Sequence, residues 1–210
     1  MTLIRRVLPV LAAVMLSGCA AITSLSESAT PLQAYELRAP SEVPEVQGSL
    51  RRDLVIETPT AGGALDIDRI LIRPDPFQVA YLPGVRWTDT APVMLQSLML
   101  RSFADTNALR YVGRRPIGGT ADYLLVSELT DFQAELGPDG DAVKTRVRLT
   151  ARLVRESDAS ILGSRTIQIT APAASTEPAA VVAGFNEATS AALQDLTVWA
   201  LRRMGLNVSE

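Results

Sequence analysis

Histidine is absent from this 210-residue sequence, and cysteine occurs only once, as Cys19. A Ser-His-Asp triad, a Cys-His pair and a histidine-ligated metal site are therefore all excluded, because each of them needs an imidazole. A single cysteine also cannot form an internal disulfide. Lysine occurs once, as Lys144, which removes most lysine-based mechanisms. We therefore expect no catalytic residue, no metal site and no cofactor.

The sequence also has no excess of positive charge. The formal net charge is -3, and no basic block follows the first few residues. Binding to nucleic acid depends on clustered lysine and arginine, so a nucleic-acid partner is not expected. The hydrophobic share of 47% and the charged share of 20% are typical of a globular protein rather than a disordered one.

The first residues have the pattern of a secretory leader. Arg5 and Arg6 form a positive region, and residues 7–16 form an apolar stretch that is too short to span a membrane. The stretch ends in a lipobox-like sequence, Leu16, Ser17, Gly18 and Cys19. We predict a lipoprotein signal peptide over 1–18, cleavage before Cys19, and lipidation of Cys19, with diacylglycerol on its thiol and palmitate as a further acyl chain on the same residue. The alternative is an ordinary secretory signal with a chance cysteine.

Residues 19–34 are small and polar and predict a lipidated tether. Several acyl chains on one residue give stable membrane anchoring. The residue after Cys19 is Ala20. In Gram-negative lipoproteins an aspartate at this position commonly signals inner-membrane retention. By that resemblance we expect attachment to the outer membrane, with the protein facing the periplasm.

The remaining sequence predicts one α+β domain over 35–206. Alternating polar and apolar residues predict long strands at 123–136 and 144–156, separated by a turn at 137–141. Residues 77–87 are expected to form a β-hairpin, and residues 40–48 and 60–64 to be loops. Shorter strands are expected at 35–37, 54–57, 70–73, 110–113 and 164–170. Two amphipathic helices, from about 91 to 107 and from about 178 to 205, should pack on one face of a largely antiparallel sheet.

Two groups of residues are candidates for partner docking. Arg86 and Trp87 combine residue types that are enriched at interfaces. The alternative is a purely structural role, in which Trp87 caps the core within a hairpin. A basic stripe is expected on the solvent-facing side of one strand, formed by Arg146, Arg148 and Arg152. It could contact an acidic partner, and the alternative is that it is an ordinary solvated face.

Several short features occur in an order that resembles a known family. They are the lipobox, Tyr35-Glu36-Leu37, Arg73-Pro74, Tyr81 followed by Arg86-Trp87 before a helix, and closing strands with an amphipathic helix. The chain resembles the ABC-type transport auxiliary lipoprotein family, which includes PqiC-like proteins.

The resemblance implies a non-enzymatic component of a lipid transport system. Such components accompany an ABC ATPase, a permease and an MCE-domain protein that bridges the periplasm. The lipoprotein would dock the distal end of that bridge at the outer membrane, and a homo-oligomeric ring is a further expectation. Two alternatives remain open: an envelope assembly factor or cell-wall synthase regulator, and a histidine-free hydrolase that acts through acidic residues.

Overall fold

A computed structural model describes residues 31–137 and 142–209. The expected signal peptide, the lipobox with Cys19 and most of the tether lie outside these residues, as do positions 138–141 of the expected turn. From Ala34 onward the chain packs as one compact unit. Neither helix of the described part combines the length and apolarity needed to cross a bilayer.

Three long antiparallel strands form the centre of this unit. They are β9 (Tyr123–Leu136), β10 (Val143–Arg155) and β11 (Ser160–Ala173), with β10 in the middle. Strict alternation along β10 buries Val147, Leu149 and Leu153 and turns the residues between them to the other face. Side chains of a strand alternate between faces, so this pattern leaves one face apolar and one polar. The sequence prediction for these strands is confirmed.

Shorter parallel strands line the other edge of β9. They are β3 (Leu50–Ile56), β4 (Thr60–Ala61) and β5 (Leu71–Arg73). A further parallel strand, β8 (Leu109–Gly113), pairs with β3. The sheet is thus mixed, with its antiparallel part in the three longest strands. The predicted α+β class is confirmed.

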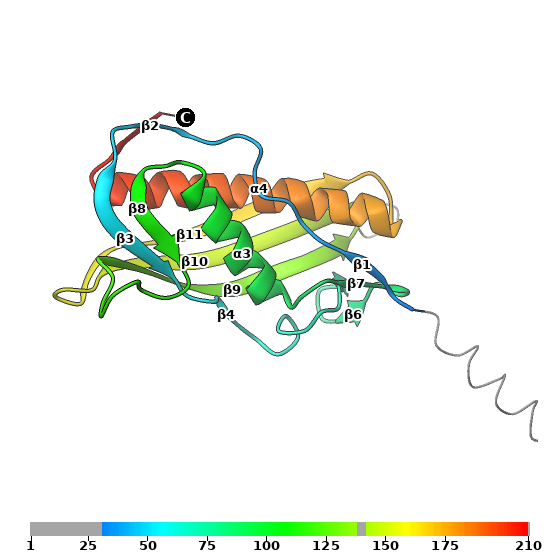
Figure 1. The fold of residues 1–210 in the computed structure, drawn as a ribbon. Coiled ribbons are helices and arrows are strands. Elements are labelled where there is room, and N and C mark those ends of the chain that lie inside the picture. The colour runs from blue at the N-terminus through cyan, green and yellow to red at the C-terminus, as the bar shows by residue number, and fades with distance from the viewer. Residues whose placement is uncertain (1–30, 138–141, 210) are drawn as a thin grey trace, which may run out of the picture. The chain divides into compact units, whose positions relative to one another are not determined.

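Two helices, α3 (Ala91–Ala104) and α4 (Pro178–Arg203), cover the apolar face of the sheet (Figure 1). Each begins with a proline in its first turn, where the missing N–H costs nothing. The chain leaves α4 through Gly205, whose φ of 95° suits glycine. The close approach of α4 to β10 depends on Gly184: a Cβ there would lie 3.1 Å from Pro172 O and from Thr145 Cγ2.

The core between α4 and the sheet is centred on three aromatic rings. Phe185 of α4 lies 4.8 Å from Phe132 and 5.4 Å from Trp87, measured between ring centroids. Trp87 and Phe132 are 5.8 Å apart. All three side chains are at most 1% exposed. Tilted and edge-on ring pairs at these distances are favourable beyond the area that they bury.

The hairpin predicted for residues 77–87 is wrong. Its two strands, β6 (Ala80–Tyr81) and β7 (Val85–Trp87), take different partners: β6 pairs with β5, and β7 pairs with β1 (Gln33–Tyr35). Burial of the Trp87 ring fixes β7 over the core. Its backbone then bonds elsewhere, with Trp87 N donating to Asp68 O at 2.7 Å and Thr88 N to Tyr35 O at 2.9 Å.

Two further expectations need correction. Residues 40–48 are not wholly loop, because β2 (Glu45–Gln47) pairs antiparallel with β12 (Asn207–Ser209) near the end of the chain. The two-residue β4 likewise replaces part of the loop expected at 60–64. Gln96 of α3 is a polar residue that the fold buries, at 6% exposed. Its Nε2 donates to Ile56 O at 2.8 Å, which satisfies the buried amide.

Two phenylalanines provide a matched test of this core. We expect Phe185→Ala to lower the free energy of unfolding by about 3–5 kcal/mol, because a fully buried ring is lost and a cavity remains. The control is Phe77→Ala, since Phe77 is 98% exposed. It should change the free energy by no more than about 0.5 kcal/mol. Urea denaturation followed by circular dichroism measures both, and equal effects would contradict the described core.

Candidate functional site

The structure separates the two predicted docking residues of β7. Trp87 is 1% exposed and belongs to the aromatic core, so its side chain is not available to a partner. The docking role considered for Trp87 is therefore corrected to a packing role. Arg86 is half-buried, and its Nη1 donates to Asp68 Oδ2 at 3.3 Å and to Trp87 O at 3.1 Å. Arg86 thus ties β7 to the preceding loop.

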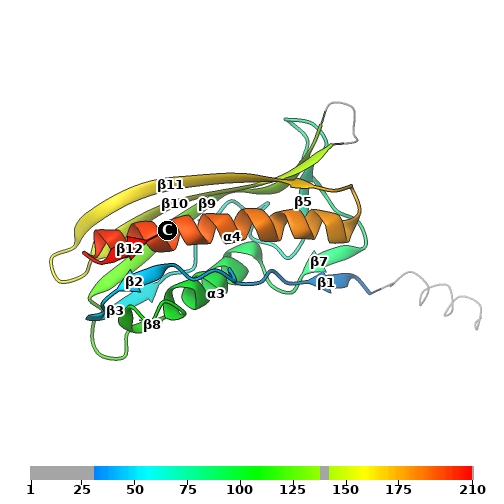
Figure 2. The ribbon, with the colours of Figure 1, turned by 90° about the horizontal axis from the view of Figure 1, so that it is seen from above.

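The three predicted arginines of β10 share one face of the sheet. We call this the open sheet face: the sides of β9, β10 and β11 that point away from α3 and α4 (Figure 2). Arg148 and Arg152 are exposed on it, whereas Arg146 is half-buried. The structure therefore places the stripe as the alternation along β10 predicts, with two of its three side chains open to solvent.

Arg146 is committed to an ion pair within the sheet. Its Nε and Nη2 donate to the two carboxylate oxygens of Glu135 at 2.8 and 3.1 Å. Lys144 Nζ lies 3.2 Å from Glu135 Oε2, and Gln133 Nε2 donates to Glu135 Oε1 at 3.2 Å. Burial of Glu135 opposes ionisation, but these hydrogen bonds outweigh it and hold the pKa of the carboxyl below its usual value.

Arg148 and Arg152 differ from Arg146 because they form no ion pair of this kind with the described residues. Asp131 of β9 stands opposite Arg148 in the register, and Val126 stands opposite Arg152. Neither guanidinium makes a hydrogen bond or an ion pair within the part of the chain that the structure describes. Guanidinium groups bind carboxylates with two parallel hydrogen bonds, so this pair can recognise an acidic surface.

A groove that sequence reasoning missed lies on the other side of the sheet, beside the C-terminal half of α4. We call it the α4 groove, and its volume is about 880 Å³. It runs between α4, the start of β11 and the segment before β2. Its lining residues are Glu42, Val43, Pro44, Glu45, Arg165, Ala191, Gln194, Asp195, Val198, Trp199, Arg202 and Arg203.

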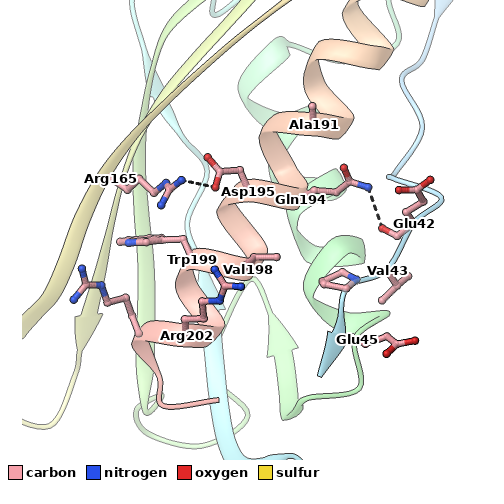
Figure 3. A pocket seen from close by; sticks show the side chains of 12 residues that line it. Glu42, Val43, Glu45, Arg165, Ala191, Gln194, Asp195, Val198, Trp199 and Arg202 are labelled. Atoms are coloured by element: carbon pink, nitrogen blue, oxygen red, sulfur yellow. Dashed lines mark hydrogen bonds and ion pairs between the residues drawn. The ribbon is translucent and has the colours of Figure 1, made fainter. Parts of the chain in front are cut away.

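Two hydrogen bonds join polar groups that line the α4 groove (Figure 3). Arg165 Nη2 donates to Asp195 Oδ1 at 2.6 Å, and Gln194 Nε2 donates to Glu42 O at 3.3 Å. The floor includes Trp199, which packs closely against Gly163 of β11. Within residues 31–137 and 142–209, no group of three or more acidic or cysteine side chains is placed to hold a metal ion. The contacts of this groove hold α4 to its surroundings and supply no nucleophile with an adjacent base.

The spacing of residues in the sequence does not predict this groove. Arg165 and Asp195 are 30 positions apart and lie on a strand and a helix. Their meeting depends on how α4 crosses the sheet. Trp199 lies on the buried side of α4, but the apolar spacing of that helix does not show that a groove borders it.

Glu135 generates a pH-dependent prediction. Its pKa is lowered on folding, so its contribution to stability is present above the ordinary glutamate pKa of about 4.3 and is lost as the pH falls through the folded value. We expect Glu135→Gln to destabilise the protein at pH 7 and to have a smaller effect near pH 3. The control is Glu128→Gln, on the same face of β9, where the carboxylate is exposed. Urea titrations at both pH values test this, and an Glu135→Gln effect that is independent of pH would contradict it.

Comparison with solved structures agrees with this architecture. A crystal structure of a DUF330 protein from Xanthomonas campestris aligns with a TM-score of 0.74 and 26% identity, covering 84% of this chain and 97% of that one. A crystal structure of an uncharacterized protein aligns with a TM-score of 0.63 and 12% identity, covering 80% and 97%. The second likeness shows a common fold alone.

A family model identifies the family of this chain. A protein of Bradyrhizobium diazoefficiens, described as uncharacterized, is 28% identical over 185 residues, which are 86% of this chain. The chain spans about half the length, 48%, of that curated relative. The model of the family described as "ABC-type transport auxiliary lipoprotein component" matches residues 35–197. This confirms the resemblance seen in the sequence, and the chain belongs to the ABC-type transport auxiliary lipoprotein family.

Proposed function

We propose that this chain is a non-enzymatic docking subunit of an MCE-linked ABC system that moves lipid between the two membranes of the envelope. The observation that carries the proposal is membership of the auxiliary lipoprotein family over residues 35–197. An auxiliary component of an ABC transporter works beside membrane-bound partners. The absence of histidine from the sequence further supports a role without turnover.

The first part of the proposal is the anchor. Cleavage after Gly18 leaves Cys19 as the first residue, and acyl chains on its thiol hold the protein at the bilayer. Ala20, rather than an aspartate, favours the outer membrane. The tether 19–34 then positions the domain on the periplasmic side.

The second part is the docking surface. Arg148 and Arg152 lie exposed on the open sheet face and have no ion-pair partner among the described residues. Complementary charge sets specificity and speeds association, so we assign these two side chains to an acidic patch near the distal end of the MCE-domain protein. Arg146 supports the same surface indirectly, because its pairing with Glu135 holds the neighbouring strands in register.

The anchor has its own test. The mature protein should begin at Cys19 and carry the mass of a diacylglycerol and a further acyl chain. We expect Cys19→Ser to leave an uncut precursor that no longer partitions into the outer-membrane fraction, since the acylated thiol is needed for processing. Intact-mass spectrometry of the purified protein measures both the cleavage and the acylation. A free sulfhydryl at Cys19 in the wild-type protein would contradict the anchor.

The docking surface is tested by charge reversal. We expect the double variant Arg148→Glu, Arg152→Glu to lower recovery of the MCE-domain protein in a detergent pull-down by about tenfold or more, because attraction becomes repulsion. Higher salt should weaken the wild-type interaction as well. The control is Arg101→Glu, since Arg101 is exposed on α3, away from the open sheet face. If the wild-type protein retains no MCE-domain protein, the transport role fails.

A further inference from the structure

The loop between β5 and β6 presents an apolar ring to solvent. Phe77 is 98% exposed, and Val79, two residues later, is 43% exposed. Single exposed apolar residues are normal on protein surfaces, so exposure by itself carries no conclusion. What distinguishes Phe77 is the way in which the loop holds it and the place where the loop lies.

A short hydrogen-bonded turn holds the ring outward. Asp75 Oδ1 accepts from Phe77 N at 2.8 Å and from Gln78 N at 2.9 Å, which is the geometry of an Asx turn. Asp75 O also accepts from Gln78 N at 3.3 Å. Pro74 and Pro76 restrict the backbone on either side of Asp75. The backbone beneath the ring is therefore ordered before any partner arrives, which reduces the entropy lost on binding.

This turn lies at the end of the domain where the chain enters. β5 runs beside the last residues of β9, with Arg73 opposite Glu135. Figure 2 shows β1, β5 and β7 in the same half of the domain. The chain enters the compact unit at Ala34, next to this end. A tether over 19–34 spans at most roughly 55 Å at 3.3–3.6 Å per residue. An anchor at Cys19 therefore keeps this end of the domain within that distance of the bilayer.

We propose that the Phe77 turn inserts its ring into the interfacial region of the membrane that carries the lipid anchor. The proposal rests on the proposed function, since it needs Cys19 to be acylated. Aromatic rings are favoured at the level of the lipid headgroups, and a second contact beside an acyl anchor fixes the orientation of a tethered domain. The long axis of β9 would then carry the far end of the domain away from the bilayer.

The surroundings favour lipid over a charged protein surface. The recess beneath the turn, of about 790 Å³, is lined by equal numbers of basic and acidic side chains. These are Arg73, Lys144 and Arg146, with Asp75, Asp131 and Glu135. The mixed signs offer no net charge to an acidic or a basic partner. Insertion should therefore be driven by the apolar ring and should resist salt, unlike docking through Arg148 and Arg152.

The test uses the full lipoprotein, processed and reconstituted in vesicles of phosphatidylethanolamine and phosphatidylglycerol. The variant Phe77→Trp places an indole at the tip. The two native tryptophans give a constant background, because Trp87 is 1% and Trp199 6% exposed. The control is Ile117→Trp, at a residue that is 72% exposed and lies before the opposite end of β9. Bromine-labelled lipids quench indole fluorescence on contact.

We expect bromine-labelled vesicles to quench Phe77→Trp severalfold more strongly than Ile117→Trp, in low and in high salt alike. Flotation with equal quenching of the two variants would overturn the insertion and leave the anchor intact. Failure to float would overturn the proposed anchor and the insertion with it. A blue shift of Phe77→Trp that requires added MCE-domain protein, without quenching by lipid, would assign the turn to a protein partner and overturn the proposal.

Discussion

Burial of both helices against one face of the sheet is the constraint on which the rest of the molecule depends. α4 reaches β10 closely because Gly184 leaves room beside Thr145, and the ring of Phe185 fills the space between helix and strands. A sheet with one face covered must present its other face to water or to a partner. The polar side of β10, with its row of arginines, is therefore left uncovered by the helices as a direct consequence of how the core is packed.

Sequence patterns succeeded where structure is decided locally. Strict alternation along residues 144–156 predicts the bounds of β10 within a residue or two. The start signal Pro178 and the stop signal Gly205 do the same for α4. They failed where pairing is decided at a distance. β2 pairs with β12 across almost the whole chain, and β7 leaves its sequence neighbour β6 because the Trp87 ring must be buried. Loop signals cannot reveal such long-range partners.

The candidate site likewise has features that local sequence patterns predict and features that depend on distant contacts. The alternation of β10 placed Arg148 and Arg152 on the wet face, and the structure has them exposed. The same reasoning could not tell that Arg146 would be bound by Glu135, 11 positions away. It left Trp87 open between a docking residue and a core residue, and its burial decides for the core. Residue type alone made Trp87 look like an interface residue, and only its surroundings correct that interpretation. Family membership supplies the context for our proposal that these exposed cations form a docking surface.

A photocrosslinking amino acid at position 148 tests the central claim most directly, in intact cells and with the anchor and partners in place. We expect a covalent product with the MCE-domain protein when the probe replaces Arg148. We expect none when the probe replaces Arg101 on the exposed side of α3. A product with that protein from position 101 but not from position 148 would contradict the assignment of the open sheet face. Its absence from both positions would contradict the docking role itself.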